Sequence, residues 1–180
     1  MKKRVVITGL GPVTPIGIEK EEFWASLTSG RSGARRINFE GYDMDQYDSQ
    51  IACTIEGFSL AEFIEKGKDF RYFGRTAEFT LSGTKLALHN AGFDLEFEKE
   101  GKGPGSYVIK GVNSETIGTI LGVGAQNMDL CEKWHRRFLE YNGPAKISPF
   151  ALPHTQICAV AVNVTMKFGI SGIIGTFVIY

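Results

Sequence analysis

The chain of 180 residues is long enough to form one ordinary domain with a hydrophobic core. Hydrophobic residues make up 43% of it and charged residues 22%, which argues against a disordered or fibrous protein. Twenty basic residues balance twenty acidic ones, so the chain lacks the positive excess of a protein that binds nucleic acid mainly through phosphates.

Membrane and redox signals are also weak. Nowhere does the chain approach the roughly 18 uninterrupted apolar residues of a membrane span, and glycine and proline break the apolar run near the N-terminus. We therefore expect no membrane span and no signal peptide. The three cysteines, Cys53, Cys131 and Cys158, form no CxxC pair, which disfavours a zinc or thioredoxin-type site. An odd cysteine count without a leader predicts a cytoplasmic protein.

The first half of the chain predicts strands and helices separated by glycine-rich turns. Consecutive β-branched residues after Arg4 are typical of a strand buried on both faces. From the N-terminus we expect a strand over 4–9, a helix over 20–28 stopped by Gly30, a short strand from residue 51, a short helix over 60–66 capped by Ser59, and a long helix over 71–90 stopped by Gly92.

The second half continues this alternation. Residues 97–115 are charged and rich in glycine, which predicts an exposed loop with room for a small hairpin. The helix over 154–168 is apolar on nearly all sides, so we expect it to be buried. The other expected elements are a strand over 116–122, a helix from an Asn127 cap through Tyr141, and a buried strand over 173–180. The order predicts an α/β fold with a mostly parallel sheet.

Several stretches, in order, resemble one family. They are RVVITGLGPVTPIG at 4–17, FWASLTSGRSG at 23–33, GTILGVG at 118–124, GPAKISPFALP at 143–153 and MKFGISG at 166–172. Together they resemble the elongating β-ketoacyl-acyl-carrier-protein synthases of the 3-oxoacyl-ACP synthase II type, over nearly the whole chain. The resemblance implies that residues 1–180 form the N-terminal half of a thiolase-like αβαβα layered fold, with a mostly parallel mixed sheet and a buried helix.

The resemblance also implies an acyltransferase reaction of fatty-acid or polyketide synthesis. A cysteine takes an acyl group as a thioester, and the carbanion left by decarboxylation of malonyl-ACP attacks it. The family's nucleophilic cysteine is expected immediately after Tyr180, and its two histidines and lysine further on, so no catalytic residue is assigned and we expect this chain alone to be inactive. No metal or resident cofactor is implied, because the acyl groups travel on the phosphopantetheine of a carrier protein.

Other functions remain open beside this one. Val178, Ile179 and Tyr180 are bulkier than the residues that the family places before its nucleophile. That departure favours a non-catalytic partner subunit of the chain-length-factor type, or a binding module that reuses the fold. The resemblance implies acyl carrier protein and a second ketosynthase-like chain, in a homo- or heterodimer, as partners.

Seven positions match binding regions of the family. Ala125, Phe150 and Ala151 correspond to its acyl pocket, although simple packing would also explain them. The basic residues Lys66, Lys68, Arg71 and Arg75 correspond to the region that docks the carrier protein. A solvated helix end is an equal explanation of this basic cluster, and Gly67 and Asp69 interrupt it.

The remaining reactive residue types have structural explanations. We expect all three cysteines to be core residues, because free cysteine is commonly buried. His89, His135 and His154 are scattered singly and are expected to be structural or surface residues. The loop GLGPVTPIG lacks the spacing of a dinucleotide-binding loop, and Pro15 has no N–H to offer a pyrophosphate.

Overall fold

The computed structural model describes residues 3–38, 41–99, 101, 103–125 and 127–178. The helices are α1 (Lys20–Thr28), α2 (Arg75–Asn90), α3 (Met128–Glu140), α4 (Ala151–Thr155) and α5 (Ala159–Lys167). The strands are β1 (Val13–Thr14), β2 (Gly17–Ile18), β3 (Ala34–Arg36), β4 (Ile51–Cys53), β5 (Leu95–Glu98), β6 (Ser106–Ile109), β7 (Thr119–Val123) and β8 (Ile174–Val178). Short 3-10 helices lie at Met44–Gln46, Leu60–Glu62, Lys68–Tyr72, Ser114–Thr116 and Pro144–Lys146.

The strands of the described residues form four two-stranded sheets. Three of them, β1–β2, β3–β4 and β5–β6, are antiparallel pairs of neighbouring strands. The fourth joins β7 and β8 in parallel, in a register that runs from Thr119 opposite Ile174 to Val123 opposite Val178. The α/β class is therefore confirmed, while the part of the chain described here contains a single parallel pair.

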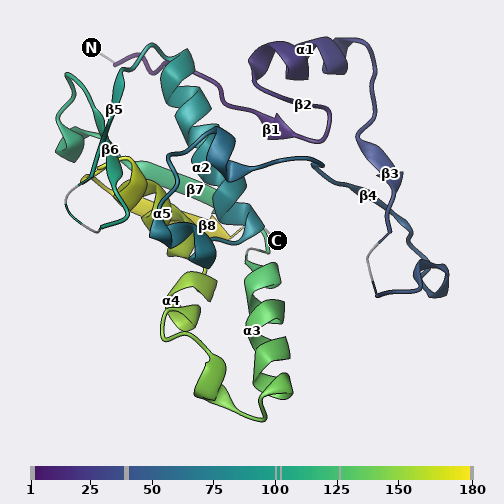
Figure 1. Cartoon of the computed structure of the whole chain (residues 1–180). Helices are drawn as coiled ribbons and strands as arrows, with labels where there is room; N and C mark the ends of the chain where they lie inside the picture. The colour runs from purple at the N-terminus through teal and green to yellow at the C-terminus, as the bar shows by residue number, and fades with distance from the viewer. Residues whose placement is uncertain (1–2, 39–40, 100, 102, 126, 179–180) are drawn as a thin grey trace.

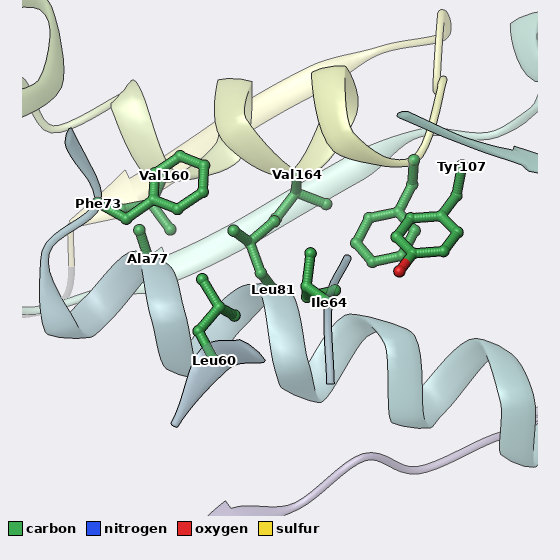
Figure 2. Packing of buried hydrophobic residues seen from close by; sticks show 9 residues of the cluster. Leu60, Ile64, Phe73, Ala77, Leu81, Tyr107, Val160 and Val164 are labelled. Atoms are coloured by element: carbon green, nitrogen blue, oxygen red, sulfur yellow. The ribbon is translucent and has the colours of Figure 1, made fainter. Parts of the chain in front are cut away.

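The hydrophobic core lies between α2 and α5, as Figure 2 shows. In Figure 1 these two helices lie beside the β7–β8 pair, whereas α1 with β1 and β2 lies to one side and α3 and α4 extend away. The core residues come from the segment before α2, from α2, from β6 and from the α5 region: Leu60, Ile64, Phe73, Ala77, Leu81, Tyr107, Val160, Val164 and Phe168. A mostly apolar α5 is buried here, as its composition predicts.

Glycine ends several of the predicted helices. Gly30, Gly92 and Gly169 follow α1, α2 and α5, and all three have positive φ, at 71°, 83° and 58°. Glycine adopts this left-handed conformation without the steric penalty of a side chain, which explains why the helices stop there. The hairpin allowed for in the charged loop is also present, as β5 and β6.

The prediction of a buried strand over 4–9 is wrong. This segment forms no strand within the described structure, and the side chain of Val5 is 95% exposed. Instead the chain runs along α2, where the Leu10 N–H donates to Asn90 Oδ1 over 3.1 Å. Gly11 permits this approach, because a Cβ there would lie 2.0 Å from the Gly83 carbonyl oxygen. Close packing of backbone on backbone takes the place of strand pairing.

Three predicted helix boundaries also need correction. The helix predicted over 154–168 is two helices, because Gln156 has an extended backbone (φ −72°, ψ 150°) between α4 and α5. The stretch predicted as helix over 60–66 forms only a 3-10 turn, and α2 begins at Arg75 instead of residue 71. Within the described residues the side chains of Ser59 and Asn127 make no cap, and Asn127 has a left-handed backbone (φ 54°). The predicted end of the last strand, 179–180, lies outside the described residues.

Candidate functional site

The basic segment before α2 is exposed. Lys66, Lys68 and Arg71 lie on its surface, and the last two belong to the 3-10 helix Lys68–Tyr72. The Arg71 guanidinium lies over the Tyr72 ring at 4.7 Å from its centroid, a favourable cation–π contact. All three cations are therefore exposed within the short segment 66–71, and their role in docking stays a prediction.

Arg75, the fourth predicted docking residue, is held by other groups of the chain. Its guanidinium pairs with Glu78 at 2.8 Å and lies over the rings of Phe58 and Phe79 at 5.1 and 4.5 Å. Its backbone N–H donates to the carboxylate of Asp129 at 2.9 Å, which ties the start of α2 to α3. Arg75 thus has a structural role, even though part of its side chain is exposed.

Asp69 does not interrupt the basic surface, because it points inward. Its carboxylate accepts from Lys167 Nζ at 3.3 Å, and the same ammonium donates to the Gly105 carbonyl at 3.3 Å. The Lys167 side chain is only 1% exposed. This buried pair joins the 3-10 helix of the basic segment to the end of α5. The sequence did not predict this pair, because its two residues are 98 positions apart. The one sign of it was a lysine at the end of a mostly apolar helix, where a buried charge needs a partner.

The three predicted acyl-pocket residues lie around the start of α4 and the loop after β7. Ala125 is exposed on that loop, and the loop is fixed to α4 by Asn127 Nδ2, which donates to the His154 carbonyl at 2.8 Å. Phe150 packs against the Tyr72 ring with 5.2 Å between centroids, whereas Ala151 is buried toward a separate hollow beside α3. Their role in an acyl pocket stays a prediction.

A cleft of about 570 Å³ opens between the basic segment, the hairpin loop, α4 and α5. Aromatic side chains, Phe73 and Phe150, form part of its wall, and Asp69 and Lys167 line it. Its remaining polar side chains are Glu98 from β5, Ser106 from β6, His154 from α4 and Asn163 from α5. The volume is typical of a small-molecule site.

His154 lies against aromatic rings at this cleft. It stacks on Tyr72 with 5.3 Å between centroids and meets Phe73 edge-on at 6.4 Å. Burial lowers the pKa of the imidazole below its ordinary value of 6.5, and the charge of Asp69 opposes this only in part. The ring is therefore neutral near pH 7.

We expect the free energy of unfolding to fall as the pH drops below about 6.5, because unfolded His154 binds a proton more readily than folded His154. The stabilisation is present above the unfolded pKa and is lost on acidification. Urea titrations between about pH 7.5 and 5.5 would show a shallower pH slope in His154→Gln than in the parent protein. His89→Gln, at an exposed histidine of α2, is measured for comparison. A pH slope in His154→Gln equal to that of the parent protein would contradict this assignment.

The expectation that the cysteines are core residues is wrong. Cys53, Cys131 and Cys158 are all free and exposed. Cys131 lies on α3, where Leu130 is the buried residue, and it lines an open hollow beside α4. Cys158 lies at the exposed break between α4 and α5. No cluster of three or more His, Cys, Asp and Glu side chains suited to a metal ion occurs within the described ranges.

Comparison with known families decides the class of this chain. The model of the β-ketoacyl synthase N-terminal domain matches residues 2–178. The chain belongs to this family. The 3-oxoacyl-[acyl-carrier-protein] synthase 2 of Vibrio cholerae is 29% identical to this β-ketoacyl synthase domain over 171 residues, which are 95% of the chain and 37% of that relative. The domain thus spans little more than a third of the length of such relatives.

Solved structures share the fold of this β-ketoacyl synthase domain. The β-ketoacyl synthase of Burkholderia phymatum superposes with a TM-score of 0.67 at 26% identity, over 97% of the domain and 39% of that chain. The ishigamide ketosynthase/chain length factor gives 0.70 at 19% identity, over 96% and 39%, which bears on the fold alone. The thiolase-like α/β fold is therefore confirmed. Among the described helices, none combines the length and the apolar character needed to cross a bilayer.

Proposed function

We propose that this chain is the N-terminal part of a 3-oxoacyl-ACP synthase that condenses an acyl thioester with malonyl-ACP. The observation that carries the proposal is the family match over residues 2–178, together with synthase 2 relatives that align with 95% of the chain. The acyl groups would travel on the phosphopantetheine of a carrier protein. None of the three exposed cysteines is proposed as the nucleophile, since each lies singly on the surface. Free exposed thiols suit a reducing cytoplasm.

The β7–β8 pair is proposed to be one part of the wider, mostly parallel mixed sheet of the thiolase-like fold. Apolar side chains on both strands are exposed, among them Ile120 at 72% and Phe177 at 62%. The unpaired segment 4–9 carries further exposed β-branched residues, such as Val5. Large exposed apolar surfaces favour association with more protein. We therefore propose that further strands and a second ketosynthase-like chain cover these faces.

Acyl carrier protein is the proposed substrate carrier, and Lys66, Lys68 and Arg71 are its proposed docking surface. All three cations are exposed in the segment 66–71, and the Asp69–Lys167 ion pair ties this segment to the end of α5. Fixed cations on a rigid turn attract an acidic partner and orient it. Arg75 contributes less to this surface, because Glu78 already neutralises it.

Charge reversal tests this docking surface. We expect Lys68→Glu and Arg71→Glu each to weaken binding of acyl carrier protein by about tenfold or more, with an effect that shrinks at high salt. Binding would be measured by titration calorimetry at two ionic strengths. Arg36→Glu is the matched control, since Arg36 is an exposed cation on the distant strand β3 and should leave the affinity unchanged. Equal losses in all three variants would show that only net charge matters and would contradict a defined surface.

A non-catalytic partner subunit of the chain-length-factor type is the second candidate. It is favoured by Val178, Ile179 and Tyr180, which are bulkier than the residues that the family resemblance places before the nucleophile. The two candidates differ in covalent chemistry. Intact-mass measurement of the natural polypeptide after incubation with acyl-ACP would show an added acyl group for a synthase and none for a partner subunit.

A further inference from the structure

Cys131 and His135 are residues of two metal-binding types on the same face of α3. They stand about one helical turn apart, at positions i and i+4, so their side chains are neighbours on the helix surface. Both residues are exposed, and both line a hollow of about 600 Å³ between α3, the 3-10 helix Pro144–Lys146 and α4, called here the α3 hollow. This spacing differs from a CxxC pair, but it is one at which two residues of a helix hold the same ion.

Both side chains are available to a ligand. The Cys131 thiol is free, and within the described structure neither it nor the His135 imidazole makes a hydrogen bond or an ion pair. The hydroxyl groups of the α3 hollow are already bonded to the backbone. Ser148 Oγ accepts from a backbone N–H at 3.2 Å, and Thr155 Oγ1 donates to a backbone carbonyl at 3.0 Å. Among the described lining residues, the thiol and the imidazole are therefore the groups left to coordinate an ion.

The lining selects the class of ion. No Asp, Glu, Lys or Arg occurs among the described residues that line the α3 hollow. Ca²⁺ and Mg²⁺ need oxygen ligands, carboxylates above all, so this lining does not suit them. A thiolate sulfur together with an imidazole nitrogen favours Zn²⁺ and ions that behave like it.

The surroundings of the pair also suit a bond between thiolate and metal. Most of the other side chains around the α3 hollow are apolar, among them Trp134, Phe138 and Ile147. They keep water from one side of the pair, and the attraction between a thiolate and a cation is stronger where less water screens it. Lys133 and Arg137 lie over the Trp134 ring, at 5.2 and 5.6 Å, so these cations have a partner other than the thiol.

We propose that Cys131 and His135 bind a divalent ion of the zinc class in the α3 hollow. The sulfur coordinates as the thiolate, its proton passes to solvent on binding, and a ring nitrogen of His135 supplies the second bond. Water completes the coordination. Catalytic zinc sites have three protein ligands and structural ones four, so a site with two exchanges its ion readily and does not hold the fold together. The site does not rest on the proposed condensation reaction.

Titration with Co²⁺ tests the proposal, because a bond between Co²⁺ and a thiolate absorbs in the near ultraviolet. The natural polypeptide that contains residues 1–180 is first treated with a chelator. We expect a thiolate band that saturates with a Kd of about 100 μM or below and that Zn²⁺ displaces. Cys131→Ser should abolish the band, and His135→Gln should weaken binding at least about tenfold. Cys131→His offers a second imidazole at the same spacing, so it should lose the band but keep Zn²⁺ binding, measured by calorimetry, within about tenfold.

Two matched variants serve as controls. Cys158→Ser removes another free, exposed thiol and His89→Gln another exposed imidazole, and both should leave the Co²⁺ affinity unchanged. Because every exchanged residue is exposed, circular dichroism should show the parent helix content in each variant. The proposal would be overturned by absence of a thiolate band at about 1 mM Co²⁺, by a band that persists in Cys131→Ser, or by an unchanged affinity in His135→Gln.

Discussion

Replacement of Phe168 by alanine is expected to lower the free energy of unfolding by about 3–5 kcal/mol. The Phe168 side chain is completely buried, and its ring stacks on Tyr107 with 5.5 Å between centroids. It closes the core at the end of α5, directly before the turn at Gly169. Alanine would remove the apolar contacts of the ring and leave a cavity between α5 and β6, because well-packed surroundings relax only in part. Urea unfolding followed by circular dichroism measures this loss.

Phe177 provides the control for Phe168. It is the same residue type on β8, but it is 62% exposed in the described structure. Phe177→Ala should change the free energy of unfolding by about 0.5 kcal/mol or less. If the two variants were equally destabilised, the core would not lie between α2 and α5.

Replacement of Lys167 by methionine is expected to lower the free energy of unfolding by about 3 kcal/mol, at the lower end of the range for broken buried pairs. The reason is the carboxylate of Asp69, which is 22% exposed and would lose its counter-charge. The double variant Lys167→Met, Asp69→Asn should recover part of this loss, because no charge is then left unpaired. Urea titrations of the two single variants and the double variant give the coupling energy directly.

The surface pair between Arg36 and Asp45 serves as reference for Lys167. Both of its side chains are largely exposed, at 67% and 75%. Arg36→Met should therefore cost less than about 1 kcal/mol. If Lys167→Met were no worse than Arg36→Met, the inward pairing of Asp69 would be wrong.

Local patterns in the sequence predicted where the helices lie better than they predicted which side chains are buried. Helical spacing located α1, α2 and α3, and glycine located the ends of α1 and α2, because these signals depend on neighbours a few residues apart. The same patterns failed for the run after Arg4 and for Cys131, which are apolar but exposed. Periodicity shows which residues can be buried together, but which of them meet another layer depends on segments far along the chain.

The candidate site shows the same division. The basic segment was visible in the sequence, and Lys66, Lys68 and Arg71 are exposed in the structure, while their role in docking stays a prediction. The inward turn of Asp69 and the internal pairing of Arg75 were not visible, since their partners Lys167 and Glu78 become neighbours only in the folded chain or on a formed helix. Phe150 and Ala151 are adjacent in sequence, yet they face different hollows because they stand at the first turn of α4.

The central claim is that this chain is the N-terminal part of a condensing enzyme. Its most direct test is product formation from acyl-ACP and malonyl-ACP by the natural polypeptide that contains residues 1–180, followed by mass spectrometry of the carrier-bound products. We predict β-ketoacyl-ACP with stoichiometric release of CO₂, and slower turnover at low substrate concentration for Lys68→Glu and Arg71→Glu. Absence of both β-ketoacyl-ACP and CO₂ over a series of acyl chain lengths, with carrier binding intact, would contradict the account.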